Sequence, residues 1–364
     1  MDGDIEHDLR EQVRAAHANA RALRIVGGAS KSFYGRHHAD GHGEPLRVGA
    51  HRGVVAYDPA ELVITARAGT RLVDLESLLD EQHQMLGFEP PRFTAEATLG
   101  GAVSAGLAGP RRPYAGAVRD FILGVKMLNG EGETMRFGGQ VMKNVAGFDI
   151  ARLIAGAMGA LGVVLEVSLR LVPRPQTEAT VMREVKRAEA IAWFNHLASR
   201  PLPLSAAAWH DGVARVRLSA SESGVRVASK SLAGEVESSS RADSFWRDLR
   251  DHRAPFFRAA RMLRVSLPPA DEWDCAHDST AQCIDWGGAQ RWLADDKRDD
   301  FADLAATRQA VAARGGHVIQ FRGGDRCGEV FHPPPPALRA LNARLKRAFD
   351  PGGILNRGRV HRDW

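Results

Sequence analysis

The sequence predicts an α+β protein of two domains, and three observations lead to this prediction. At 364 residues the chain is longer than one typical domain. Prolines 173 and 175 end an apolar run rich in β-branched residues and mark a boundary. Beyond them, over 180–232, the sequence favours strand, helix, strand, strand and helix in that order. This order is typical of an antiparallel sheet covered by helices.

The elements expected before the boundary rest on apolar spacing and on turn residues. Ile5, Leu9 and Val13 are spaced by four residues, and Thr70 precedes a run in which leucines recur on one helical face. The expected elements are a helix over 5–22, strands over 23–26, 54–57 and 62–66, a helix over 69–80 with Thr70 as N-cap, a strand and turn over 85–91, strands over 121–128 and 133–137 joined at Asn129-Gly130, a helix over 150–156 capped by Asp149, and a strand over 163–172.

The same reasoning applied after the boundary predicts a domain over 176–336, and a final segment over 337–364. The expected elements are strands over 180–185, 205–210, 213–220, 263–267, 281–285 and 317–322, helices over 188–200, 222–232, 299–314 and 337–349, a polar loop over 235–241, and a stiff proline linker over 332–336. The glycine-rich tail over 350–359 is expected to fold back onto the first domain, 1–175, at its ligand site.

Composition excludes several classes of function. Hydrophobic residues make up 44% of the chain and charged residues 26%, as in ordinary globular proteins. The net charge is +5, but basic and acidic residues are interleaved and no nucleic-acid motif occurs, so nucleic-acid binding is not expected. Apolar runs fall short of the ~18 residues that span a bilayer. The acidic start is unlike a signal peptide, so we expect a cytoplasmic protein that meets a membrane only through partners.

The cysteines do not form a metal-binding pattern. Cys275, Cys283 and Cys327 are odd in number and form no Cys-x-x-Cys pair, so neither a disulfide framework nor an iron–sulfur or zinc site is expected. Redox chemistry would therefore come from a bound cofactor.

The most unusual stretch is 98–120, which holds five glycines, two prolines and three arginines. Glycine lacks a Cβ and allows backbone N–H groups to face an anion or a flat ring. A mobile surface loop is the alternative, but Leu99, Val103 and Leu107 lie at helical spacing and favour an ordered element. Upstream, a short strand runs into Gly27-Gly-Ala-Ser-Lys-Ser32, which suits a phosphate, although a plain β-turn is the alternative.

Three motifs in this order resemble the FAD-binding domain of the vanillyl-alcohol oxidase and p-cresol methylhydroxylase family. They are 27–31, 98–101 with 116–120, and 147–149 with 159–163, and the tail 349–356 is similar to the family's C-terminal signature. The resemblance implies a two-part FAD-binding domain followed by an α+β cap. It further implies that the first motif holds the pyrophosphate, the second follows the ribityl chain and isoalloxazine, and the third lies near the adenine.

Further motifs, at 106–114, 136–139, 141–147, 284–290 and 321–325, resemble the FAD-binding subunit of bacterial glycolate oxidase. This implies a multi-subunit enzyme that oxidises glycolate to glyoxylate, with a homologous FAD-bearing subunit and an iron–sulfur subunit as partners. The cofactor-binding residues that the two resemblances imply are Gly27, Gly28, Ala29, Ser30, Lys31, Ser32, Thr98, Leu99, Gly100, Gly101, Ser104, Gly106, Gly109, Tyr114, Gly116, Val118, Asp120, Gly162, Val163 and Asn356.

Two positions depart from the family pattern. Ala29 stands where members with covalent FAD carry histidine, so we expect non-covalent FAD. Arg357 stands where the family usually has proline after the asparagine of the tail.

The sequence does not identify a catalytic residue. Oxidation of a 2-hydroxy acid needs a cation for the carboxylate and a proton acceptor for the hydroxyl. His210, His277, His317 and His332 are isolated in the sequence, so no metal site is expected, and each is more simply a surface or core residue. Arg111 and Arg112 could bind substrate, flavin phosphate or a neighbouring subunit, and Trp286 and Trp292 are expected in a core or an interface.

Two alternatives to a catalytic glycolate oxidase subunit therefore remain. One is a flavin-stabilised assembly subunit without turnover of its own. The other is a stand-alone flavin oxidase of a sugar or aldonolactone.

Overall fold

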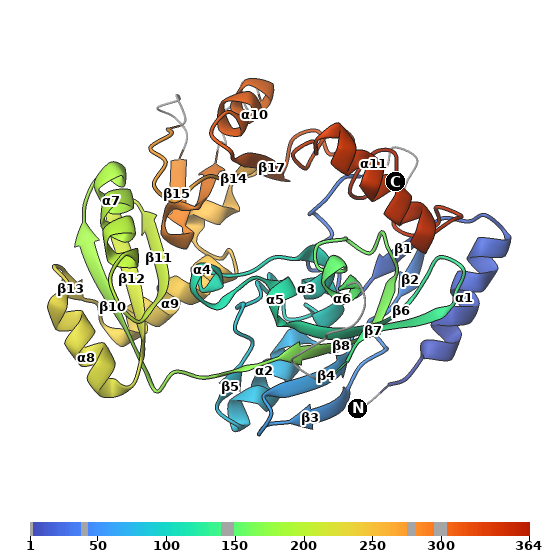
Figure 1. Ribbon diagram of the computed structural model, residues 1–364, viewed down its shortest axis with the longest axis horizontal. Coiled ribbons are helices and arrows are strands. Elements are labelled where there is room, and N and C mark those ends of the chain that lie inside the picture. Colours follow the sequence, from blue (N-terminus) through green and yellow to red (C-terminus); the bar gives the residue numbers. More distant parts are fainter. Residues whose placement is uncertain (1–2, 38–42, 140–148, 275–280, 295–303) are drawn as a thin grey trace. The chain divides into compact units, whose positions relative to one another are not determined.

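The computed structural model describes residues 3–37, 43–139, 149–274, 281–294 and 304–364 (Figure 1). The chain forms two compact units. Unit 1 comprises Met1–Leu107, Ala117–Arg174 and Asp325–Trp364, and unit 2 comprises Ala108–Gly116 and Pro175–Gly324. These limits differ from the expected ones in two places, because 325–336 lies with unit 1 and 108–116 lies with unit 2.

Unit 1 is built on a five-stranded antiparallel sheet with the order β3-β4-β8-β6-β7. Its strands are β1 (Leu23–Val26), β2 (Glu44–Arg47), β3 (Val54–Asp58), β4 (Val63–Arg67), β5 (Gln84–Met85), β6 (Ile122–Leu128), β7 (Thr134–Gly138), β8 (Val163–Arg170) and β9 (Val172–Pro173). Its helices are α1 (Glu6–Ala18), α2 (Leu72–Glu81), α3 (Leu99–Ala105), α5 (Val118–Phe121), α6 (Ile150–Leu153) and α11 (Pro336–Phe349). The other described strands of unit 1 form two pairs. β1 and β2 are parallel, and the short β5 and β9 are antiparallel.

The central strand of this sheet is β8, which pairs with β4 on one side and β6 on the other (Figure 1). Val163, Leu165, Val167 and Leu169 on this strand are fully buried. A continuous apolar run is what a strand buried on both faces requires. This explains why 163–172 was recognisable as a strand from the sequence.

Unit 2 contains an eight-stranded antiparallel sheet with the order β13-β10-β12-β11-β15-β16-β14-β17. Its strands are β10 (Thr177–Glu184), β11 (Leu204–His210), β12 (Val213–Ala220), β13 (Glu235–Val236), β14 (Met262–Ser266), β15 (Ala281–Asp285), β16 (Gln290–Ala294) and β17 (His317–Arg322). Its helical segments are α4 (Arg112–Ala115), α7 (Arg187–Ala198), α8 (Glu222–Ser231), α9 (Ser239–Arg250), α10 (Leu304–Ala312) and the 3₁₀ turns η1 (Pro255–Arg258) and η2 (Trp286–Gly288). The predicted α+β class with an antiparallel second sheet is confirmed.

Several local predictions were wrong. The N-cap of α2 is Arg71 rather than Thr70, because the Thr70 hydroxyl is engaged with the Gly53 backbone, accepting from its N–H at 2.9 Å and donating to its carbonyl at 3.2 Å. Asp149 does occupy the N-cap of α6, but its side chain makes no capping bond and pairs instead with Arg152 at 2.9 Å.

The expected loop over 235–241 is instead the edge strand β13 and the start of α9. Its serines lie at the beginning of α9, where Ser238 is the N-cap residue. The apolar face of this helix, Ala242, Trp246 and Leu249, lies just beyond the serines. Of the expected helix over 299–314, residues 299–303 fall outside the described residues. The motif over 141–147, residues 147 and 148 of the 147–149 motif, Cys275 and His277 also fall outside them.

One buried histidine in unit 2 makes the stability of the protein depend on pH. The imidazole of His252 stacks on Phe257 at 4.2 Å between ring centroids and meets Trp292 edge-on at 4.8 Å. Burial, reinforced by the nearby Arg322 and Arg264 and only partly opposed by Asp251, lowers the pKa of His252 to about 3. The imidazole is therefore neutral in the folded protein at neutral pH.

We expect acid to favour unfolding through this group, because the unfolded chain takes up a proton near the ordinary histidine pKa and the folded chain does not. As the pH falls from about 6.5 to about 4.5, His252 alone should remove about 2 kcal/mol of stability. Urea unfolding at both pH values measures the loss. In His252→Phe, which keeps a flat ring and cannot titrate, the loss should be smaller by about this amount. An identical loss in both proteins would show that His252 does not carry the effect.

A cofactor cavity in unit 1

Unit 1 contains a cavity of about 430 Å³, within the range of roughly 300–1,000 Å³ that is usual for ligand sites. Four segments provide most of its lining, namely β1 with the loop that follows, α3, the turn before β8, and the C-terminal tail, while Val48 and Ala68 add single residues. The lining residues are Arg24, Ile25, Val26, Gly27, Gly28, Ala29, Ser30, Lys31, Ser32, Phe33, His37, Val48, Ala68, Thr98, Gly100, Gly101, Ser104, Ala105, Met158, Gly159, Gly162, Val164, Asn356, Arg357 and Arg359.

The start of α3 presents nearly bare backbone to the cavity. Thr98 caps the helix by accepting a hydrogen bond from the Gly101 N–H at 3.3 Å. A Cβ on Gly100 would lie 2.7 Å from the Cβ of Ala68, so this glycine is required for packing. A Cβ on Gly101 would meet only the Thr98 hydroxyl, at 3.2 Å. Gly101 therefore leaves space in the cavity itself.

The two glycines after β1 line the cavity and also allow close packing of the backbone. A Cβ on Gly28 would lie 1.4 Å from the Glu96 carbonyl oxygen, and one on Gly27 would lie 2.5 Å from the Thr98 hydroxyl. These glycines allow the loop after β1 to approach the residues just before α3. Two motifs that are seventy residues apart thereby meet at one cavity.

Lys31 lines the cavity but is turned toward protein groups. Its side chain is 8% exposed, its Nζ donates to the Ser30 hydroxyl at 3.3 Å, and it lies 5.4 Å from the centre of the Phe93 ring. These contacts fix the ammonium group at the wall of the cavity.

The C-terminal tail returns to unit 1 along β1. The Leu23 N–H donates to the Ile354 carbonyl at 2.7 Å, and the Asn356 N–H donates to the Leu23 carbonyl at 2.9 Å. The Asn356 side chain accepts from the Ile25 N–H at 2.8 Å and donates to the Met158 carbonyl at 2.6 Å. Asn356 thus joins three of the four lining segments.

Three arginines, of which Arg36 is buried and Arg326 and Arg359 are half-buried, join the two ends of the chain by binding backbone carbonyls. Arg36 donates to the carbonyls of Gly328, Gly358 and Cys327, the first two at 2.7 and 2.8 Å. In the opposite direction, Arg359 donates to the carbonyls of Ser32, Tyr34 and Arg36, and Arg326 donates to that of Gly35. These bonds explain why 325–336 belongs to unit 1.

The arginine cluster is strongly electropositive. Burial lowers the pKa of Arg359 to about 10, with the positive charges of Arg326 and Arg24 adding to the effect. Burial likewise lowers the pKa of Arg326 to about 10. The neighbouring His37 has a lowered pKa as well, because it is partly buried and faces Arg359 and Arg326. An anion at this end of the cavity would relieve the repulsion.

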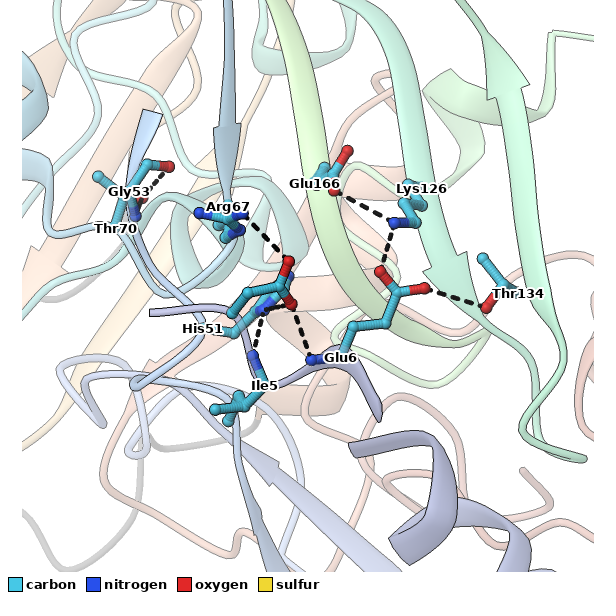
Figure 2. A network of polar contacts seen from close by, with 10 residues as sticks. Ile5, Glu6, His51, Gly53, Arg67, Thr70, Lys126, Thr134 and Glu166 are labelled. Carbon is cyan, nitrogen blue, oxygen red and sulfur yellow. Dashed lines mark hydrogen bonds and ion pairs between the residues drawn. The ribbon is translucent and has the colours of Figure 1, made fainter. Parts of the chain in front are cut away.

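A network of polar contacts joins the residues just before and at the start of α1 to the end of β4 and to neighbouring segments (Figure 2). Asp4 pairs with Arg67 at 3.1 Å, and Glu6 pairs with Lys126, which also lies 3.3 Å from Glu166. His51, fully buried, accepts from the Ile5 N–H at 3.3 Å, and burial lowers its pKa. Arg67 directly precedes Ala68, the residue against which Gly100 packs.

The structure brings twelve of the expected cofactor-binding residues to this cavity and leaves eight away from it. Those at the cavity are Gly27, Gly28, Ala29, Ser30, Lys31, Ser32, Thr98, Gly100, Gly101, Ser104, Gly162 and Asn356. In unit 1 but not lining it are Leu99, Gly106, Val118, Asp120 and Val163; in unit 2 are Gly109, Tyr114 and Gly116.

The reasons for these placements are local. Leu99 and Val163 are fully buried in the packing of unit 1. Gly106 ends α3 with a positive φ of 64°, and the Asp120 carboxylate accepts a hydrogen bond from the Ala117 N–H at 2.8 Å. Each of these residues thus has a structural role in its own element.

The segment 108–116 is held within unit 2 by strong contacts. The Trp286 indole N–H donates to the Gly109 carbonyl at 3.0 Å, and Arg112 lies 4.4 Å from the centre of the Trp286 ring. Arg111 pairs with Glu178 at 2.6 Å. Burial opposes the ionised form of Glu178, but Arg217 and Arg111 together lower its pKa.

Tyr114, in the same segment, keeps its phenolic proton at neutral pH and so is not available to accept one. Its pKa is raised to about 12, first by burial and then by the charge of Asp285. The buried Trp286 and Trp292 lie in the core of unit 2, as expected.

Sequence reasoning missed Arg24, His37, Met158, Arg357 and Arg359 as cavity residues. The basic residues among them lie close to recognised motifs in the sequence. This closeness was the sequence feature that could have identified them as cavity residues. Within the described ranges, no group of three or more His, Cys, Asp or Glu side chains is placed to hold a metal ion. None of the helices in the described part of the chain has the length and apolar character needed to cross a bilayer.

Comparisons with known proteins agree with this cavity. A family profile described as an FAD binding domain matches residues 4–138. Glycolate oxidase subunit GlcE of Escherichia coli (strain K12) is 42% identical, over 98% of each chain. Glycolate oxidase subunit GlcD of Bacillus subtilis (strain 168) is 30% identical over 38% of this chain and 29% of its own length. The solved structure of an alkyldihydroxyacetonephosphate synthase superposes with a TM-score of 0.68 at 14% identity, covering 96% of this chain and 75% of that one.

The family profile and the whole-length relative place the chain among FAD-dependent oxidoreductases, and its fold is the one seen in the alkyldihydroxyacetonephosphate synthase structure. The residues present fit this cofactor, since glycines leave the cavity open and hydroxyl, amide and guanidinium donors line it. Within this class, the chain belongs to the family of glycolate oxidase subunit GlcE.

Proposed function

We propose that this protein is the FAD-binding subunit of a multi-subunit glycolate oxidase. The observation that carries the proposal is the meeting of motifs from both ends of the chain at one cavity, in a protein 42% identical to a glycolate oxidase subunit along its whole length. The partial similarity to GlcD supports a homologous FAD-bearing partner. We further propose an iron–sulfur subunit as the electron acceptor, and association with a membrane only through such partners.

Glycolate loses two electrons and two protons when it becomes glyoxylate. FAD held in this cavity would supply the hydride acceptor, and a protein group would accept the hydroxyl proton. We propose that unit 1 is the FAD domain and that unit 2 is the cap through which the chain meets substrate or partner subunits. In unit 1, the chain's own residues hold the cofactor and exclude water from it. The proton acceptor is not among the residues assigned so far.

The test compares the chain alone with the assembled complex under anaerobic conditions. Glycolate should bleach the oxidised flavin absorbance of the complex, while acetate, which lacks the hydroxyl, should leave it unchanged. A complex rebuilt with the Gly101→Val chain lacks this subunit's FAD and shows what that FAD contributes.

A large loss of glycolate oxidation in that rebuilt complex supports a redox role for this subunit. An unchanged rate would favour the assembly subunit, and full turnover of a sugar or aldonolactone by the isolated chain would favour the stand-alone oxidase. A chain that neither carries FAD nor takes it up would overturn the proposal.

A further inference from the structure

Two arginines line the cofactor cavity without a hydrogen-bond or ion-pair partner among the described residues. They are Arg24, on β1, and Arg357, in the tail. Arg24 is half-buried and Arg357 is exposed. A guanidinium group carries five N–H donors and keeps its charge at neutral pH. Both side chains thus retain the capacity to bind an anion.

The other cations at this cavity are already engaged with protein groups. Arg359 donates to three backbone carbonyls of the loop after β1, and Arg36, just behind it, donates to three carbonyls of the C-terminal part. Lys31 contacts Ser30 and the Phe93 ring. These groups shape the cavity and contribute positive potential, but their donors are largely committed.

Arg24 and Arg357 are brought together by the pairing of the tail with β1. The Asn356 N–H bonds to the Leu23 carbonyl, and the Asn356 side chain accepts from the Ile25 N–H. Arg24 therefore lies between two residues that bind Asn356, and Arg357 follows Asn356 directly. Two segments that are distant in the sequence thus each contribute one arginine to the lining of the same cavity.

Among the described residues that line this cavity, none is an aspartate or a glutamate. The positive charges in the lining repel one another: burial is the largest cause of the lowered pKa of Arg359, and the charges of Arg326 and Arg24 lower it further. A diphosphate offers charge-assisted hydrogen bonds to more than one guanidinium and relieves this repulsion.

We propose that Arg24 and Arg357 bind the diphosphate of FAD directly, and that Lys31 and Arg359 position the surrounding loop. Arg357 replaces the proline of the family pattern, so the tail of this protein contributes a charge that the pattern does not supply. The proposal concerns the cofactor and does not depend on which substrate the enzyme oxidises.

The test measures FAD affinity of the FAD-depleted chain by quenching of flavin fluorescence. Arg357→Ala and Arg24→Ala should each raise the Kd for FAD about 10-fold, and the double variant should raise it further; its departure from about 100-fold measures the coupling of two side chains that share one diphosphate. Arg357→Pro should match Arg357→Ala, whereas Arg357→Lys should keep most of the affinity. The matched control is Arg362→Ala, which removes an exposed arginine from the same tail but outside the cavity lining.

Salt and competition identify the part of FAD that is contacted. Raising the salt from about 0.05 to about 0.5 M should weaken FAD binding to the parent chain more than to the double variant. ADP, which has a diphosphate, should compete with FAD less well in the variants than in the parent chain. Adenosine, which lacks a diphosphate, should compete equally well in all of them. Far-UV circular dichroism and the Tm confirm that each variant is folded.

Two results would overturn the proposal. If Arg357→Lys is as weak as Arg357→Ala and adenosine competition falls with it, Arg357 stacks on the adenine instead. If the double variant binds FAD as the parent does, the diphosphate is held by the loop after β1 without these arginines. Both results are independent of glycolate turnover, so they can be told apart from a failure of the proposed function.

Discussion

Replacing Gly101 with valine should produce a chain that folds and lacks FAD. The new side chain would enter the cavity, because the only protein atom near the Cβ position is the Thr98 hydroxyl at 3.2 Å. The residue lies inside α3, where valine is tolerated at a cost below about 1 kcal/mol. The ratio of flavin to protein absorbance should fall at least about 10-fold, since losing a few kcal/mol of cofactor contact has this effect.

The matched control for this variant is Gly28→Ala. Its added methyl group would lie 1.4 Å from the Glu96 carbonyl oxygen, so the loop after β1 could no longer approach the start of α3. We expect this smaller substitution to lower both the Tm and the FAD content. If Gly101→Val instead reduces secondary structure as much as it reduces FAD, Gly101 is a packing glycine and the assignment of the cavity at this point is wrong.

Replacing Asp350 with alanine should destabilise the protein strongly and release its C-terminal tail. Lys346 of α11 is buried, and its ammonium donates to the Asp350 carboxylate at 2.6 Å and to the carbonyls of Ala160 and Leu355 at 2.8 Å. Asp350 also accepts from the backbone N–H groups of Ile354 and Leu355, at 3.0 and 2.8 Å. Removing the carboxylate leaves a buried ammonium without its counter-charge, which costs about 3–5 kcal/mol.

Urea unfolding measures this loss, and limited proteolysis of the tail shows where it acts. Burial lowers the pKa of Lys346 despite the opposing charge of Asp350, so the ion pair is needed to keep the ammonium charged inside the protein. The double variant Lys346→Met with Asp350→Ala should recover part of the stability, because no uncompensated charge remains. Asp363→Ala, which removes an exposed partner of Arg339, should leave the urea midpoint unchanged. If Asp350→Ala is equally mild, the tail is held mainly by its backbone bonds to β1.

Much of the fold was predictable because local and tertiary requirements coincide. The strand over 163–172 reads as apolar because it is buried between β4 and β6. The start of α3 is signalled by Thr98, which does cap the helix. In α9, serines begin the helix and its buried apolar residues come later. The serines favour a loop, so the sequence did not indicate the helix.

The candidate site was predictable in part. Twelve of the expected residues do lie at the cavity, and nine of these are glycines, serines or threonine from the recognised motifs. Arg24, Arg357 and Arg359 belong to no motif, and only the pairing of the tail with β1 places them there. The sequence also could not show that 108–116 leaves unit 1, since Glu178 and Trp286, which hold this segment, are distant in the chain.

The path of the chain through the two units has a consequence for how the protein is made. Residues 108–116 leave the ribosome before Glu178 is synthesised, and long before Trp286, yet they are fixed by both. Unit 1 likewise lacks α11 until the whole of unit 2 has been synthesised. Neither unit can therefore be completed from one continuous stretch of the nascent chain. A fragment over 1–174, which lacks α11 and the tail, should be less stable and less soluble than the whole chain.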